Sequence, residues 1–176
     1  MLFKKKKRSD DNTASEFLKD TILYLHNLAE SKGFAKKGFI FNEGLMRVGE
    51  VFVKESLSAP FEPQMTPKEF LYSIATSNMQ LGMVFGRKCG LGAKNINDLY
   101  SQIDSFDSIF QELEILLRDD LCMTFEQWDG FRHFIVPKCS EILLPYMDNP
   151  NKDAYVFRTL LSYYLLGVSI GIEKYE

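Results

Sequence analysis

Cysteine and histidine are scarce in this sequence of 176 residues, and their scarcity excludes several kinds of site. The three cysteines, Cys89, Cys122 and Cys139, are too few and too far apart for a disulfide framework or a Cys-x-x-Cys metal site. Neither of the two histidines, His26 and His133, belongs to a Glu-x-x-His pair of the kind that binds metals in helical bundles. We therefore predict no metal, no cofactor and a reducing, cytoplasmic location.

We also expect neither a secretory signal nor a membrane-spanning helix. Met1-Leu2-Phe3 is followed by basic residues instead of the apolar core that a signal peptide requires. Residues 159–172 carry no charge, but these 14 residues extend only about 21 Å as a helix, and a span needs roughly 20 residues. We interpret this stretch as the buried central helix of a globular fold.

The charge of the chain is divided unevenly. The formal net charge is −3, and residues 4–8 contribute five positive charges to it. The rest of the sequence has 16 basic and 24 acidic residues. A nucleic-acid-binding body is normally basic, so nucleic acid is not an expected partner. We interpret residues 1–12 as a disordered basic tail, with weak contact to an anionic membrane as the alternative.

Two segments of the chain, Pro60–Gly86 and Pro145–Gly171, match each other at a spacing of 85 residues. Each opens with Pro and an aromatic residue, and each ends in Leu-Gly-x-x-x-Gly, in which the first glycine is Gly82 or Gly167. Self-similarity at a fixed spacing is the sequence signature of a repeated structural unit. The match therefore indicates an internal duplication.

Helix start and stop signals occur along the whole chain. Capping residues predict helices that start after Thr13, Thr66 and Thr124, Gly33 should end the first of them, and Pro137 should break another. No strand is expected. The sequence thus predicts an all-α, single-domain bundle of about six helices over residues 13–176. Its finer organisation is interpreted as two pseudo-repeated three-helix units, residues 13–90 and 95–176.

One of these helices has a clear apolar period. Its expected buried face consists of Leu99, Ile103, Phe106, Phe110, Leu113 and Leu117.

The paired glycines have two interpretations. Each glycine inside a helix costs about 1 kcal/mol relative to alanine, so a compensating close approach of two helices is expected. We therefore predict that the helices bearing Gly82 and Gly167 cross each other near a pseudo-twofold axis. The alternative is a ligand-binding groove at these glycines. Tyr163 and Tyr164 cannot both face one side of a helix, so one of them would line that groove.

A glycine-rich basic stretch at residues 86–95 is the only candidate anion site. Arg87, Lys88 and Lys94 would be the contacts, although the spacing of a P-loop is absent and a plain connection between helices is the other interpretation. If the basic side chains lie close, they should lower the pKa of the Cys89 thiol.

No set of catalytic residues is recognisable from spacing. We therefore expect a non-enzymatic protein-interaction module, of an adaptor, inhibitor or immunity type, whose acidic body docks on a basic protein partner. A helical bundle that binds an apolar small ligand between the two units is one alternative, and an enzyme whose site is not readable from spacing is another. The sequence predicts neither the partner's identity nor the oligomeric state.

Overall fold

The protein is an all-α bundle, as expected from the sequence. The computed structural model describes residues 6–33, 43–58, 64–92 and 106–172, and no strand occurs among them. The helices are α1 (Lys6–Ser31), α2 (Glu43–Ser58), α3 (Pro67–Gly90), α5 (Phe106–Ile115), α6 (Phe125–Ile135), α7 (Lys138–Leu143) and α8 (Lys152–Ile172), with a π-helical turn η1 (Leu116–Asp120) and a 3-10 turn η2 (Leu144–Tyr146).

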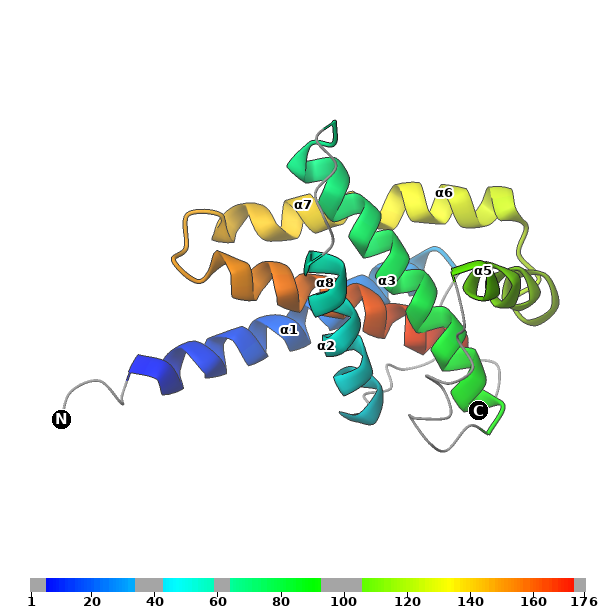
Figure 1. Ribbon diagram of the computed structural model, residues 1–176, viewed down its shortest axis with the longest axis horizontal. Coiled ribbons are helices and arrows are strands. Elements are labelled where there is room, and N and C mark those ends of the chain that lie inside the picture. Colours follow the sequence, from blue (N-terminus) through cyan, green and yellow to red (C-terminus); the bar gives the residue numbers. More distant parts are fainter. Residues whose placement is uncertain (1–5, 34–42, 59–63, 93–105, 173–176) are drawn as a thin grey trace.

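The centre of the fold is the crossing of α3 and α8, which run in the same direction (Figure 1). A Cβ atom built on Gly82 would overlap the carbonyl oxygen of Tyr164 and lie 3.0 Å from the amide nitrogen of Val168. A Cβ atom on Gly167 would meet Met79 and Met83 of α3 in the same way. The two backbones therefore touch because the side chains are missing, and the predicted crossing at these glycines is confirmed.

The second glycine of each motif extends this reciprocal contact. Gly86 lies against the backbone of Val168, and Gly171 lies against the backbone of Met83. Each contact is thus matched by another between residues that stand 85 positions apart, so the crossing itself has local twofold character. Close backbone contact of this kind gains dispersion energy and weak Cα–H···O contacts.

The other helices enclose this pair. α1 and α2 pack on α8, α5 packs on α3, and α7 contacts both central helices. α8 is long and apolar enough to cross a membrane by length and composition, and 83% of its most apolar window is buried inside the fold. From Thr159 to Ile172 every residue of α8 is buried, so the uncharged stretch is the central helix that its length predicted.

Three helix boundaries follow local sequence rules. In the capping boxes before α3 and α6, the amide of Thr66 donates to Glu69 and the amide of Thr124 donates to Gln127, each at 2.8 Å. Pro137 separates α6 from α7 because it has no amide hydrogen to continue the helix. These predictions are confirmed.

The predicted start of the first helix at Thr13 is wrong. α1 begins at Lys6, and Thr13 lies inside it. Neither proline nor glycine occurs in residues 6–12, so the preceding chain has no residue that prevents it from joining the helix. Residues 1–5 lie outside the described residues, and the role expected for the basic segment stays a prediction.

The predicted buried face of α5 is also wrong in part. Phe110 is 52% exposed, whereas Ile109, Leu113, Leu116 and Leu117 are buried. Both sets of positions fit helical spacing, so the period alone does not decide which side of α5 is buried against α3. The expected members Leu99 and Ile103 lie outside the described residues, as does the side chain of Phe106.

Candidate functional site

The glycines predicted as ligand contacts are closed by protein backbone. Gly82 and Gly167 each face the opposite central helix so closely that even a methyl group would overlap it. No ligand fits between them. The interpretation of these glycines as helix-packing residues agrees with the geometry, whereas their interpretation as a ligand-binding groove does not.

Tyr163 is a buried structural link. Its hydroxyl donates to the carbonyl oxygens of Ile135, at 2.8 Å, and Val136, at 3.2 Å. These carbonyls lie at the break between α6 and α7, where Pro137 interrupts the helical hydrogen bonds. Burial also raises the pKa of Tyr163 well above its ordinary value. The side chain therefore satisfies the broken helix and lines no open cavity.

Tyr164 points toward α2. Its ring covers Gly49, where a Cβ atom would lie 2.7 Å from the ring carbon Cε1. The rings of Phe52 of α2 and Phe85 of α3 also lie near the Tyr164 ring, each with its centroid 6.4 Å from that of Tyr164. The two adjacent tyrosines thus face different neighbours, as adjacency on a helix requires, but both are fully buried.

The basic residues proposed as anion contacts have carboxylate partners inside the fold. Arg87 forms ion pairs with Asp120 and, at 3.2 Å, with Glu112. The amino group of Lys88 lies 3.9 Å from Glu112. These pairs join α3 to α5 and to the π turn. Lys94 lies outside the described residues, so an anion site built on all three residues stays a prediction, with two of its members already engaged.

The π turn positions one of these carboxylates. The amide of Leu121 donates to the carbonyl oxygen of Leu116 at 2.9 Å, which closes a ring one residue larger than that of an α-helix. Asp120 stands at the end of this turn and reaches Arg87. The chain then reverses at Cys122, whose φ of 51° is in the left-handed region, and enters α6.

Neither Cys89 nor Cys139 is an activated thiol, because burial raises the pKa of both. Burial raises the pKa of the half-buried Cys89 thiol, in contrast to the lowering expected from its basic neighbours. The reason is that Arg87 and Lys88 are directed to Glu112 and Asp120. All three cysteines are free thiols.

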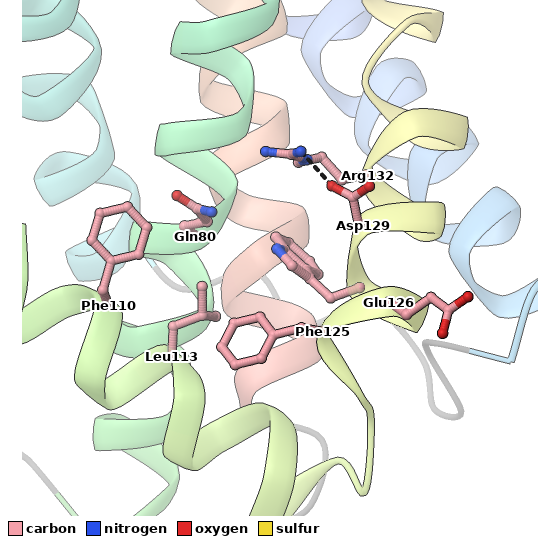
Figure 2. Close-up of a pocket in the computed structure, with 8 residues that line it drawn as sticks. Gln80, Phe110, Leu113, Phe125, Glu126, Asp129 and Arg132 are labelled. Carbon is pink, nitrogen blue, oxygen red and sulfur yellow. Dashed lines mark hydrogen bonds and ion pairs between the residues drawn. The ribbon is translucent and has the colours of Figure 1, made fainter.

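An aromatic cleft between α3, α5 and α6 is the best candidate site, and the sequence did not reveal it (Figure 2). Its volume is about 420 Å³. Leu113 and Trp128, which are 1% and 4% exposed, form its buried side, whereas Phe110 and Phe125 are 52% and 55% exposed. Gln80 of α3 completes the lining. We call this feature the aromatic cleft.

One end of the aromatic cleft is polar. In Figure 2 the amide of Gln80 and the guanidinium group of Arg132 lie at one end, and Leu113 and Phe125 lie at the other. Arg132 forms an ion pair with Asp129, yet its Nε atom is buried and has no hydrogen-bond partner among the described residues. The cleft therefore offers an apolar surface beside a hydrogen-bond donor.

Asp129 also contacts a histidine. The Nδ1 atom of His133 lies 3.2 Å from the Asp129 carboxylate, one helical turn away. Both side chains are more than half exposed, so this contact contributes little to stability.

The acidic charge of the protein is concentrated around the aromatic cleft. Residues 106–135, which form α5, η1 and α6, include seven acidic and two basic residues, a formal charge of −5. Each of the other described stretches, residues 6–33, 43–58, 64–92 and 136–172, has a formal charge between −1 and +2. The segment that forms most of the aromatic cleft is thus the most acidic of the described stretches, and two of its carboxylates, Glu112 and Asp120, pair with basic residues of α3.

Two signals in the sequence could have indicated the cleft. Phe125 directly follows the cap residue Thr124, and the first turn of a capped helix is commonly exposed. The charge of residues 106–135 is visible by counting. Neither signal brings Phe110 and Phe125 together, because that depends on how α5 and α6 are placed relative to each other in the fold.

Comparison with known proteins adds no assignment: no family model, curated protein or solved structure matches the chain. Within the described ranges, no group of three or more His, Cys, Asp or Glu side chains is placed to hold a metal ion. The functional argument therefore depends on the aromatic cleft itself.

Proposed function

We propose that this protein is a non-enzymatic interaction module that docks on another protein through the aromatic cleft. The observation that carries the proposal is the exposure of Phe110 and Phe125 beside the buried Trp128. Aromatic side chains and arginine are enriched at the energetic centres of protein interfaces, and Arg132 borders the same cleft. Exposed aromatic residues that share one cleft are costly to leave in water and are typical of binding surfaces.

The charge around the cleft favours a basic partner. Opposite charge steers association and disfavours wrong partners, and seven of the nine charged residues in the segment 106–135 are acidic. The same charge repels nucleic acid. We thus retain an adaptor, inhibitor or immunity-type role in the cytoplasm, where free thiols such as Cys122 persist.

Site-specific photo-crosslinking in the native cell tests this proposal. A photoreactive phenylalanine analogue replaces Phe125 in the cleft, and a matched variant carries it at Leu144, which is 67% exposed and lies outside the cleft. We expect a discrete crosslinked protein from the Phe125 position alone. Equal crosslinking from both positions, or none from Phe125, would contradict a docking role for the cleft.

An apolar small ligand is the second candidate, because the cleft volume of about 420 Å³ falls in the range of small-molecule sites. The guanidinium group of Arg132, at the polar end of the cleft, would hold a carboxylate or carbonyl of such a ligand. A screen of aromatic carboxylic acids by thermal shift tests this candidate. A ligand that stabilises the wild type but not an Arg132→Leu variant would favour it over protein docking.

A further inference from the structure

The chain carries opposite charges in two separate places. Residues 4–8 are five consecutive basic residues, and the apolar Leu2 and Phe3 precede them. The segment 106–135, which forms most of the aromatic cleft, has a formal charge of −5. A segment that combines apolar and basic residues is thus present in the same chain as an acidic, apolar cleft.

We propose that the aromatic cleft binds residues 1–8 of a second copy of this chain. Leu2 and Phe3 supply apolar side chains for the space bordered by Phe110 and Phe125, and Lys4 to Arg8 face the acidic surface around it. The inference rests on the proposed function, since it uses the same cleft, and it names the occupant. A short segment with two apolar residues suits such a cleft because a few anchors supply most of the affinity.

The geometry favours a second copy over the same molecule. α1 is fixed on α8 by buried side chains, among them Leu18, Ile22 and Leu25. Its N-terminal end points away from the body, at the end of the molecule opposite α5 and α6 (Figure 1). The five residues before α1 extend at most about 18 Å, so they do not span the fold.

The arrangement that follows is head-to-tail. One copy contributes the basic segment and the next contributes the cleft, so the two contacting surfaces differ. The first copy still has its cleft free, and the second still has its basic segment free. Such heterologous contacts produce open chains or closed rings instead of a symmetric dimer. Continued growth with protein concentration therefore distinguishes this arrangement from a symmetric dimer.

Complementation of two variants, measured by sedimentation velocity, tests the proposal. Leu2→Ser/Phe3→Ser removes the apolar anchor and leaves the cleft intact, whereas Phe110→Ser/Phe125→Ser removes the cleft walls and leaves the segment intact. We expect the wild type to form species that grow with protein concentration and each variant to be monomeric. An equimolar mixture of the variants should form a dimer that grows no further.

Two controls distinguish this contact from non-specific association. Leu144→Ser, at an exposed apolar residue outside the cleft, should associate like the wild type. Raising the salt concentration from about 0.05 M to 0.5 M should weaken association roughly tenfold or more, because exposed charges are then screened. Three results would each overturn the proposal. The wild type is monomeric at several hundred micromolar, the mixture of the two variants stays monomeric, or the Leu2→Ser/Phe3→Ser variant associates by itself.

A labelled peptide makes failure of this inference distinguishable from failure of the proposed function. A fluorescent peptide of residues 1–8 should bind the Leu2→Ser/Phe3→Ser variant, whose cleft is intact. A matched peptide with serine in place of Leu2 and Phe3 should bind at least about tenfold more weakly. Equal binding of both peptides overturns the inference. If the peptide does not bind while Phe125 crosslinks a different protein in cells, this inference fails and the proposed function stands.

Discussion

The helix crossing and the aromatic cleft share α3, yet they are built in opposite ways. Gly82 serves the crossing by lacking a side chain, and Gln80, two residues earlier, borders the cleft among large aromatic side chains. The crossing is backbone against backbone between two helices, and the cleft depends on the relative placement of three. Stability should therefore be sensitive to the smallest addition at the crossing and tolerant of large changes at the cleft.

The largest effect is expected at the crossing. Gly82→Leu should lower the free energy of unfolding by about 3 kcal/mol or more, because the added atoms overlap the backbone of Tyr164 and Val168. Gly130→Leu in α6 is the matched control, since nothing lies within 4 Å of a Cβ atom there, and its stability should be unchanged or slightly higher. Urea denaturation of both variants measures the difference, and equal midpoints would refute the packing argument.

The ion pairs that join α3 to the cleft segment come next. Arg87→Gln should cost about 2 kcal/mol, because Asp120, whose side chain is 13% exposed, loses its partner. Arg118→Gln removes an ion pair on the surface, where the side chain is 66% exposed, and should cost less than about 0.5 kcal/mol. Comparable losses in the two variants would show that the π turn does not depend on Arg87.

A smaller effect is expected at the broken helix. Tyr163→Phe removes the donor to the carbonyl groups of Ile135 and Val136 and should cost about 1 to 2 kcal/mol. Tyr72→Phe removes a buried hydroxyl that has no hydrogen-bond partner among the described residues, so it should be nearly neutral. Thermal denaturation compares the two variants directly. A Tyr163→Phe variant as stable as the wild type would mean that water, instead of Tyr163, donates to the carbonyl groups at the break.

The repeat of whole three-helix units stays a prediction, and the reciprocal crossing of α3 and α8 offers a test of it by exchanging two equivalent residues. Met83 and Val168 stand 85 residues apart and occupy equivalent places beside Gly171 and Gly86. Met83→Val and Val168→Met should each cost about 1 kcal/mol, and the double exchange should cost less than their sum. Strict additivity in a double-mutant cycle would count against an approximate twofold axis.

The smallest effect on stability is expected at the cleft. Phe110→Ser/Phe125→Ser should change the free energy of unfolding by less than about 0.5 kcal/mol per residue, because both rings are already half exposed. The same variant should lose its self-association, measured by sedimentation velocity. A large loss of stability would indicate that these rings belong to the core and would remove the main argument for a docking surface.

The difference between the two regions also explains what the sequence could predict. The crossing is encoded by four glycines at fixed spacing, and their meaning follows from a backbone rule that needs no tertiary information. Helix caps at Thr66 and Thr124 and the break at Pro137 are local in the same sense. For these features, the residues that form the contact are also the residues that carry the signal.

The aromatic cleft, the ion pairs of Arg87 and the hydrogen bonds of Tyr163 were not predictable in this way. By spacing Phe110 fits a buried or an exposed position equally well, and the packing of α5 on α3 decides between them. The partners of Arg87 are 25 and 33 residues away on another element, so spacing gave no reason to pair them and left an anion site open. Spacing predicted only that Tyr163 and Tyr164 face different sides. The partner of Tyr163 was not predictable, because the carbonyl group of Ile135 becomes available only through the break at Pro137.

The parallel direction of α3 and α8 has a consequence for how this architecture can vary. A chain that leaves α3 has to return along the length of the pair before α8 can begin, and α5, η1, α6 and α7 make up most of that return path. The return path carries most of the aromatic cleft but supplies none of the glycine contacts. Exposed positions on it, such as Phe110 and Phe125, can accordingly change without disturbing the crossing of the two central helices.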